Sequence, residues 1–253
     1  MKVWAIADLH LSFGIPNKEM DVFGERWAHH SQKIELHWRE LIGEDDLVLI
    51  AGDISWALHL EDAAVDLNWI AALPGIKVLS KGNHDLWWKS MSKVKTILPP
   101  NMHLIHNNSF TYNGITVGGT RLWDHLDNDY EPYIEFRKVP KEVHVHPKIH
   151  SKEEELHDAK IYKNELDRLK TSLNDLDPKA KVRIAMLHYP PAGPTNRSTE
   201  VTEILESYKI NFCVYGHLHN LKPNAPVNFE QNGVSYFCTA CDFLAFKPLL
   251  LLY

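Results

Sequence analysis

Short hydrophobic runs alternate along the chain with longer stretches in which hydrophobic and polar residues are mixed. Each run is rich in β-branched or aliphatic residues and ends at polar residues or glycine, which is typical of strands buried on both faces of a sheet. Alternating strands and helices favour a layered α/β architecture. The runs are KVWAIA (2–7), DLVLIA (46–51), IKVLS (76–80), VRIAML (182–187) and NFCVYG (211–216), and the predicted helices span 27–42, 61–73 and 86–97.

Three further segments resemble the strands of hairpins. They are MHLIH (102–106), SFTYNGITVGG (109–119) and GVSYFCTA (233–240), and the second contains Asn113-Gly114, a strong signal for a two-residue turn. Hairpin strands pair in an antiparallel manner, so we expect a mixed sheet, or two packed sheets, rather than one purely parallel sheet.

The alternating pattern is interrupted from about residue 124 to residue 160, where charged residues, proline and histidine dominate. We interpret this segment as a surface insertion that caps the mouth of the active site and sets substrate choice, because long non-periodic insertions in compact domains are often functional. Its residues His144, His146 and His150 could bind an additional metal, although an exposed loop is the favoured interpretation.

A helix with one hydrophobic face follows the insertion. Hydrophobic residues recur there every three or four positions, which predicts a stripe that faces the core. The members of this stripe are Leu156, Ala159, Tyr162, Leu166, Leu169 and Leu173.

The composition is that of an ordinary globular protein, and 253 residues suffice for a single domain that spans 1–253. The net charge of −6 gives no general attraction to nucleic acid or an anionic membrane. No hydrophobic run is long enough for a signal peptide or a membrane span. The odd count of three cysteines indicates a reducing cytoplasm. The Cys238/Cys241 pair lies in a hydrophobic stretch and is interpreted as part of the core.

The most informative feature of the sequence is the group of potential metal ligands at the end of each predicted buried strand. The chain has 16 histidines, and histidine is the commonest metal ligand among side chains. Each motif alone is weak evidence for a metal site. Packing of a hydrophobic core, however, does not require five strands to end in potential metal ligands. In α/β sheets, ligands bind at the carboxyl ends of the strands. The motifs are Asp8-x-His10, Gly52-Asp53, Gly82-Asn83-His84-Asp85, His188 and Gly216-His217-x-His219.

These motifs, in this order, resemble those of the calcineurin-like metallophosphoesterase family. The resemblance covers residues 8 to 219. It implies a four-layer α/β/β/α sandwich of two mixed sheets flanked by helices, with a dinuclear metal centre at the strand ends. It also implies that Asp8, His10 and His219 hold one metal, that Asn83, His188 and His217 hold the second, and that Asp53 bridges the two.

The chemistry of phosphoester hydrolysis agrees with this division of roles. Two divalent ions about 3.5–4 Å apart can activate a bridging hydroxide and stabilise the attacking and leaving oxygens. The resemblance leaves His84 free of metal, facing the leaving group and oriented by Asp85, where it can donate a proton. A nitrogen and oxygen ligand set suits manganese, iron or zinc, so the identity of the metals stays open.

Other residues near the motifs are candidates for contact with substrate. Arg121 could bind a phosphate in a bidentate manner, or form an ion pair, and Arg197 lies on the loop after His188. The aromatic residues beside the ligands could line a pocket but are individually better explained by packing. They are Trp56, Trp87, Trp88 and Tyr189.

Several functions compete for this sequence. GDISWAL and GNHD differ from the motifs of eukaryotic-type protein serine/threonine phosphatases, and Trp56 stands where purple acid phosphatases use a tyrosine ligand. The leading hypothesis is a binuclear-metal phosphohydrolase that cleaves a small phosphomonoester or phosphodiester. A nuclease is the first alternative, disfavoured by the acidic charge balance. A non-catalytic scaffold of the same fold is the second alternative, disfavoured because every ligand position is filled.

Overall fold

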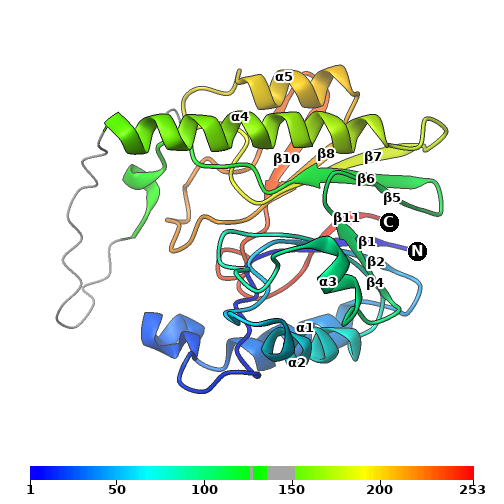
Figure 1. Ribbon diagram of the computed structural model, residues 1–253, viewed down its shortest axis with the longest axis vertical. Helices are drawn as coiled ribbons and strands as arrows, with labels where there is room; N and C mark the ends of the chain where they lie inside the picture. The colour runs from blue at the N-terminus through cyan, green and yellow to red at the C-terminus, as the bar shows by residue number, and fades with distance from the viewer. Residues whose placement is uncertain (126–127, 136–151) are drawn as a thin grey trace.

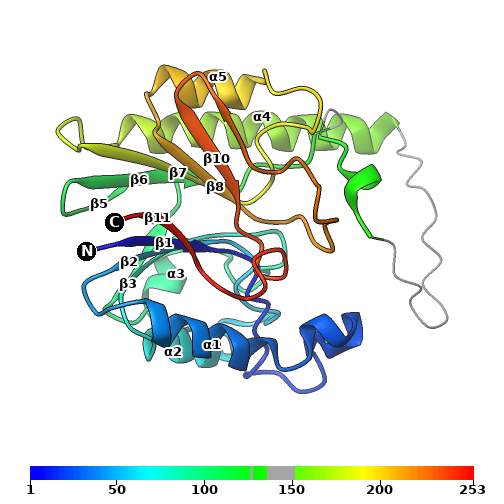
Figure 2. The same ribbon diagram turned by 180° about the vertical axis from the view of Figure 1, so that it is seen from behind.

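The computed structural model describes residues 1–125, 128–135 and 152–253. Within these ranges two sheets pack face to face and helices cover their outer faces (Figures 1 and 2). The layers therefore follow the order α/β/β/α, and the predicted fold class is confirmed. About half of the predicted cap (residues 126–127 and 136–151), including His144, His146 and His150, lies outside the described residues, and its last part, residues 152–160, belongs to a helix.

The first sheet is parallel except at one edge. Its strand order is β11-β1-β2-β3-β4, and only β11 runs antiparallel to its neighbour. Parallel alignment brings the carboxyl ends of β1, β2 and β3 to the same edge of the sheet. The strands are β1 (Val3–Ile6), β2 (Leu47–Ala51), β3 (Ile76–Ser80), β4 (Met102–Ile105) and β11 (Leu249–Leu252).

The second sheet has a parallel centre and a hairpin at each edge. Its order is β5-β6-β7-β8-β10-β9, in which β5 pairs antiparallel with β6 and β9 pairs antiparallel with β10. Within the described residues, both sheets therefore contain parallel and antiparallel strands, as predicted. The strands are β5 (Phe110–Tyr112), β6 (Ile115–Thr120), β7 (Val182–Leu187), β8 (Phe212–Tyr215), β9 (Phe229–Gln231) and β10 (Val234–Cys238).

The hairpin predictions are confirmed in two places and wrong in one. Asn113 and Gly114 connect β5 to β6 with φ angles of 48° and 81°, as a tight turn between antiparallel strands requires. Strand β10 also belongs to a hairpin. The segment MHLIH does not, because β4 pairs parallel with β3 and thereby extends the first sheet.

Helices cover the outer face of each sheet. Helices α1 and α2 lie over the first sheet, and α4 and α5 lie over the second (Figure 1). None of the helices within the described ranges is both long enough and apolar enough to cross a membrane. The helices are α1 (His30–Leu41), α2 (Leu60–Ala71), α3 (Met91–Lys95), α4 (Lys152–Asn174) and α5 (Glu200–Ser207), with short 3-10 turns at Met20–Phe23, Glu25–Trp27 and Glu131–Tyr133.

Two helix predictions need correction. The helix predicted over 86–97 is reduced to α3, because the residues before it form a turn in which Trp88 N–H donates to the carbonyl of Asp85. The stripe predicted along α4 faces the core only in its later part. Leu166, Leu169 and Leu173 are buried, whereas Leu156 is 65% exposed and Ala159 is also exposed.

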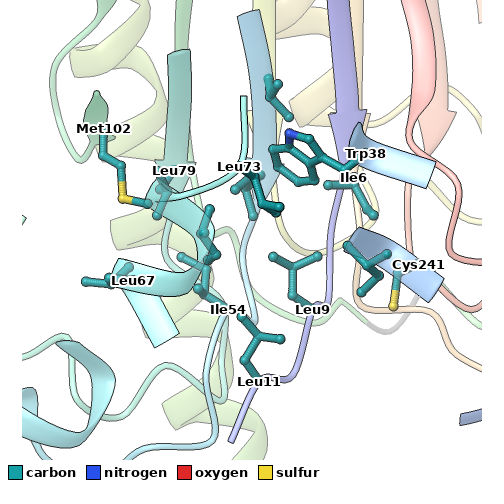
Figure 3. Packing of buried hydrophobic residues seen from close by; sticks show 14 of the residues in the cluster. Ile6, Leu9, Leu11, Trp38, Ile54, Leu67, Leu73, Leu79, Met102 and Cys241 are labelled. Atoms are coloured by element: carbon teal, nitrogen blue, oxygen red, sulfur yellow. The ribbon is translucent and has the colours of Figure 1, made fainter. Parts of the chain in front are cut away.

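The alternating direction of side chains along the strands explains why both faces of each sheet are hydrophobic. In β2, Val48 and Ile50 belong to the cluster that packs against the helices, which Figure 3 shows around Trp38 and Leu67, while Leu47 and Leu49 pack toward the other sheet. Successive side chains of a strand point to opposite faces, so a strand between two layers is hydrophobic at most of its positions. The two cysteines of the CxxC motif, Cys238 and Cys241, are buried and free, as predicted.

Ser172 connects α4 to the second sheet. Its side chain is fully buried, its hydroxyl donates to the carbonyl of Asn108 (2.6 Å), and it accepts from the N–H of Gly119 in β6 (2.7 Å). The substitution Ser172→Ala removes the partner of the buried N–H of Gly119 and of the half-buried carbonyl of Asn108, so we expect the free energy of unfolding to fall by about 2 kcal/mol. Urea unfolding measures this change. The control is Thr171→Ala, an exposed neighbour on the same helix, and an equal effect of both variants would contradict the role of Ser172.

Candidate metal centre

The predicted ligands gather at the carboxyl ends of the central strands. Three motifs follow β1, β2 and β3 of the first sheet, and two follow β7 and β8 of the second. A bridge between Ala7 and Ala240 connects the two sheets close to this edge. The seven predicted ligands are all within hydrogen-bond or ion-pair contact of at least one other member. They are Asp8, His10, Asp53, Asn83, His188, His217 and His219.

One group of possible ligands consists of Asp8, His10 and His219. One ligand atom from each lies within 4.8 Å of the others. The Nε2 atoms of His10 and His219 are 3.1 Å apart, and His219 Nε2 is 3.8 Å from Asp8 Oδ1. These three residues are the ones predicted to hold the first metal.

A second group consists of Asn83, His188 and His217. The Oδ1 atom of Asn83 lies 2.7 Å from His188 Nε2 and 3.0 Å from His217 Nδ1. The side-chain oxygen and two ring nitrogens therefore converge on one point. This group matches the set predicted for the second metal.

Asp53 lies between the two groups. Its Oδ2 atom is 3.7 Å from His10 Nε2, and its Oδ1 atom is 3.5 Å from His188 Nε2. Asp8 is also close to both groups, since one of its oxygens forms a cluster with Asp53 and His188 within 4.8 Å. The two oxygens of Asp53 face different groups, which is the geometry that a bridging carboxylate needs.

Hydrogen bonds on the far side of two rings leave a nitrogen free to bind a metal. His188 Nδ1 is 3.0 Å from the carbonyl of Ala51. A carbonyl can only accept, so Nδ1 carries a hydrogen, and Nε2 is the atom that can bind a metal once its own proton is lost. His219 Nδ1 is held in the same way by Asp242 Oδ1, at 2.9 Å. Such partners orient metal-binding histidines and raise their basicity.

Asp242 is a site residue that the motifs did not reveal. It is 4% exposed, and besides His219 it accepts from the N–H of Asn220 (2.9 Å) and lies 3.8 Å from Arg26. A signal was present in the sequence, because Asp242 is the only charged residue of the hydrophobic stretch VSYFCTACDFLAF. A buried carboxylate needs a partner.

The backbone around the ligands is adapted to close packing. Asp8, His10, Asp53 and His217 have φ angles of 59°, 45°, 50° and 71°, a left-handed conformation that is costly for such residues. A Cβ atom on Gly82 would collide with the carboxylate of Asp53, and one on Gly216 would collide with that of Asp8. The glycines of the motifs are therefore required for the carboxylates to reach their positions.

The protein alone leaves the charges of this site poorly balanced. Burial raises the pKa of Asp8 to about 7. Burial opposes ionisation of Asp53 as well, but His188 and His10 beside it hold its pKa below the usual range. Burial opposes protonation of His188, yet Asp53 and Asp8 raise its pKa to about 9. Bound cations would supply the positive charge that the carboxylates now take from protonated histidine.

The residues present fit a pair of divalent ions. Two groups of nitrogen and oxygen atoms converge on either side of the carboxylate of Asp53. Manganese, iron and zinc all accept such ligands. The identity of the metals is not decided by this donor set.

His84 and Asp85 differ from each other in their surroundings. The half-buried ring of His84 lies 4.4 Å from the ring of Trp56 and 5.6 Å from that of His10. Burial lowers its pKa. No hydrogen bond joins this ring to any of the metal-binding atoms in the described part of the chain, so it is free to face a ligand.

The prediction that Asp85 orients the ring of His84 is wrong. The fully buried carboxylate of Asp85 instead accepts four N–H groups, because the loop folds back over it and offers donors at 2.8–3.2 Å. Asp85 therefore connects the loop of Asn83 and His84 to the loop that follows Asp53. The donors are the backbone N–H groups of Ile54, Ser55 and Gly82 and the indole of Trp87.

The two arginines predicted to contact substrate have protein partners. Arg121 lies 3.7 Å from Glu165 and 4.6 Å above the ring of Trp123. Arg197 donates to the carbonyl of Pro226 and to the hydroxyl of Tyr130, and packs 4.0 Å above a phenylalanine ring. Their contact with substrate stays a prediction.

The aromatic residues near the motifs divide into two kinds. Trp87 and Trp88 are both 2% exposed and belong to the core, as expected from packing. Trp56 stacks on the His10 ring at 4.8 Å, and Tyr189 lies 4.1 Å from the His217 ring. The latter two form walls of the site.

Comparison with known proteins agrees with this geometry. The family model described as calcineurin-like phosphoesterase matches residues 1–221. The matched region contains all seven predicted ligands as well as His84. The resemblance inferred from the motifs is confirmed, and so, at the level of the family, is the prediction of a hydrolase that acts on phosphoester bonds.

Individual relatives are more distant. The chain is 36% identical over 84 residues to the Gene 66 protein of Mycobacterium phage D29 and 35% identical over 86 residues to that of phage L5. These matches cover 33% and 32% of this chain and 40% and 39% of the relatives, so the chain spans about two fifths of their length. The phosphopantetheinyl hydrolase of Mycobacterium tuberculosis shares the fold, with a TM-score of 0.56, 15% identity, and coverage of 99% of this chain and 95% of that one.

The partner of His219 provides a test of the site. Asp242→Asn keeps a side chain that can accept from Asn220 but removes the charge that holds the His219 ring. We expect the affinity of the site of Asp8, His10 and His219 to fall about 10–100-fold, with the second site less affected. Elemental analysis and titration with a competing chelator measure this loss. Asp167→Asn, an exposed change on α4, is the control, and unchanged affinity in Asp242→Asn would rule out the supporting role.

Proposed function

We propose that this chain, which belongs to the calcineurin-like phosphoesterase family, hydrolyses a small phosphomonoester or phosphodiester at a centre of two metal ions. The observation that carries the proposal is the position of Asp53, whose two oxygens face different groups of ligand atoms. When bound, two divalent ions would activate a water molecule and offset the negative charge of the phosphoryl group.

Two groups of residues, with one carboxylate shared between them, would bind these ions. Asp8, His10 and His219 would hold one ion, and Asn83, His188 and His217 the other, with Asp53 shared. Carboxylates are placed where positive charge is concentrated, while imidazole and amide groups fill the remaining positions without adding negative charge. Ala51 and Asp242 keep two of the rings in the tautomer that can bind.

We assign His84 the role of general acid. Its ring is half-buried, has no side-chain hydrogen bond in the described part of the chain, and lies beside Trp56 and His10. Its backbone N–H donates to Asp53 Oδ1 at 2.8 Å, which fixes the start of the side chain next to the centre. A protonated ring at this position can give its proton to the leaving oxygen. Asp85 then acts as a positioning residue that holds the loop and not the ring.

The surroundings favour a small substrate in a reducing compartment. The net charge of −6 disfavours a nucleic acid. The three cysteines are free and buried, and Cys241 donates from its thiol to the carbonyl of Asp8 at 2.9 Å. A compartment that keeps thiols reduced preserves this contact beneath the site.

The bridging role of Asp53 is tested by Asp53→Ala. Removal of the shared carboxylate should empty both metal positions, because each group then loses the charge that offsets a divalent ion. Elemental analysis of the purified variant measures this, and circular dichroism checks the fold. Asp45→Ala, an exposed carboxylate change near β2, is the control and should keep both ions. Two ions retained in Asp53→Ala would disprove the bridging assignment.

The role of His84 is tested by His84→Ala. The variant should keep both metals and lose turnover on an alkyl phosphate by about 10²–10⁴-fold, the usual contribution of a positioned acid. On p-nitrophenyl phosphate the loss should be smaller, because that phenolate leaves without a proton. The control is His59→Ala, an exposed histidine. Equal losses on both esters would point to stabilisation of charge instead, and loss of a metal would make His84 a ligand.

A further inference from the structure

A cavity lies beside the candidate metal centre, where the ends of β3, β4 and β6 meet α4. Its volume is about 200 Å³, which is smaller than the ~300–1,000 Å³ of pockets that hold whole drug-sized ligands. It is therefore suited to a compact group. Four cationic residues and a single carboxylate line it, namely Lys81, Lys89, Arg121, Arg168 and Glu165.

The carboxylate of Glu165 holds the two arginines of this cavity in position. Glu165 is 4% exposed and accepts from the hydroxyl of Thr120. Its Oε1 atom lies 3.3 Å from Arg168 and 3.7 Å from Arg121. One carboxylate offsets only one of the two guanidinium groups, so it positions both and leaves the cavity with an excess of positive charge. That excess occurs in a chain whose net charge is −6.

A lysine in the wall adds to this positive charge. Lys81 donates from Nζ to the carbonyl of Trp88 at 2.7 Å, which fixes the position of its ammonium group at the cavity. A group of cationic side chains with a single carboxylate among them is a suitable environment for an anion such as a phosphate or a carboxylate.

The walls of the cavity are joined through the backbone to residues of the candidate metal centre. Lys81 precedes Asn83 by two residues, so their Cα atoms are at most ~7.6 Å apart. On the other sheet, the carbonyl of Arg121 accepts from the N–H groups of His188 and Tyr189, at 3.2 and 3.0 Å. A molecule held at the metals by one phosphoryl group can therefore extend a second group toward this cluster.

We propose that this cavity binds a second anionic group, a phosphate or a carboxylate, of the molecule whose phosphoester bond is cleaved at the metal centre. The proposal rests on the function proposed above. It makes the protein selective for substrates that carry two anionic groups, and it assigns Arg121, Arg168 and Lys81 to the recognition of the group that is not hydrolysed.

The first experiment measures anion binding without catalysis. Sulfate is titrated at low ionic strength into the metal-loaded protein and into the variants Asp53→Ala, Arg168→Gln and Lys163→Gln. Asp53→Ala should still bind sulfate, because the cavity does not depend on the metals. Arg168→Gln should weaken binding about tenfold, whereas Lys163→Gln, an exposed charge change on the same helix, should alter it less than about twofold. Absence of saturable binding in Asp53→Ala, or equal weakening by both charge changes, would overturn the site.

The second experiment tests the link to substrate. Phosphate release is measured from propane-1,3-diol monophosphate and from the matching bisphosphate. We expect wild type to favour the bisphosphate in kcat/KM, Arg168→Gln to lower the ratio of the two values about tenfold, and Lys163→Gln to keep it. An unchanged ratio in Arg168→Gln would overturn the substrate role alone. Failure of the metal-loaded wild type to hydrolyse either ester would instead overturn the proposed function.

Discussion

The site depends on the burial of two carboxylates next to each other. Asp8 is fully buried and Asp53 is 1% exposed, and neither can be ionised in such a place without nearby positive charge. The surrounding loops are shaped by this requirement. Gly82 and Gly216 make room for the carboxylates, and four of the candidate ligand residues adopt left-handed backbone conformations. Strain of this kind persists only where the rest of the fold compensates for it.

Much of the fold and the grouping of the candidate ligands could be predicted because both follow from local patterns. A strand buried on two faces is hydrophobic throughout, and polar residues at its end interrupt that pattern visibly, as at Asp53 and His188. Parallel pairing then brings residues that are far apart in the sequence to the same edge of the sheet, so no long-range signal in the sequence is needed to predict that they meet. The hairpin at Asn113-Gly114 was predictable for the same reason, since the turn is encoded by its own two residues.

The errors arose where tertiary contacts override local preference. Asp85 was expected to orient His84, but the loop folds so that backbone donors from two segments surround the carboxylate. A turn in which Trp88 N–H donates to the backbone carbonyl of Asp85 likewise replaces the first part of the helix predicted over 86–97. Asp242 was missed because its importance depends on β10 ending beside His219, which no motif near either residue reveals.

The pairing of the first strand with the last has a consequence for biosynthesis. Strand β1 lies between β2 and β11, and Val3 pairs with Leu252; both chain ends accordingly lie side by side (Figures 1 and 2). While the chain is being made, β1 to β4 emerge long before β11 does. Until then one edge of a hydrophobic sheet has unpaired backbone groups, which is a template for aggregation. The chain is therefore most prone to aggregation during the interval between synthesis of β4 and synthesis of β11.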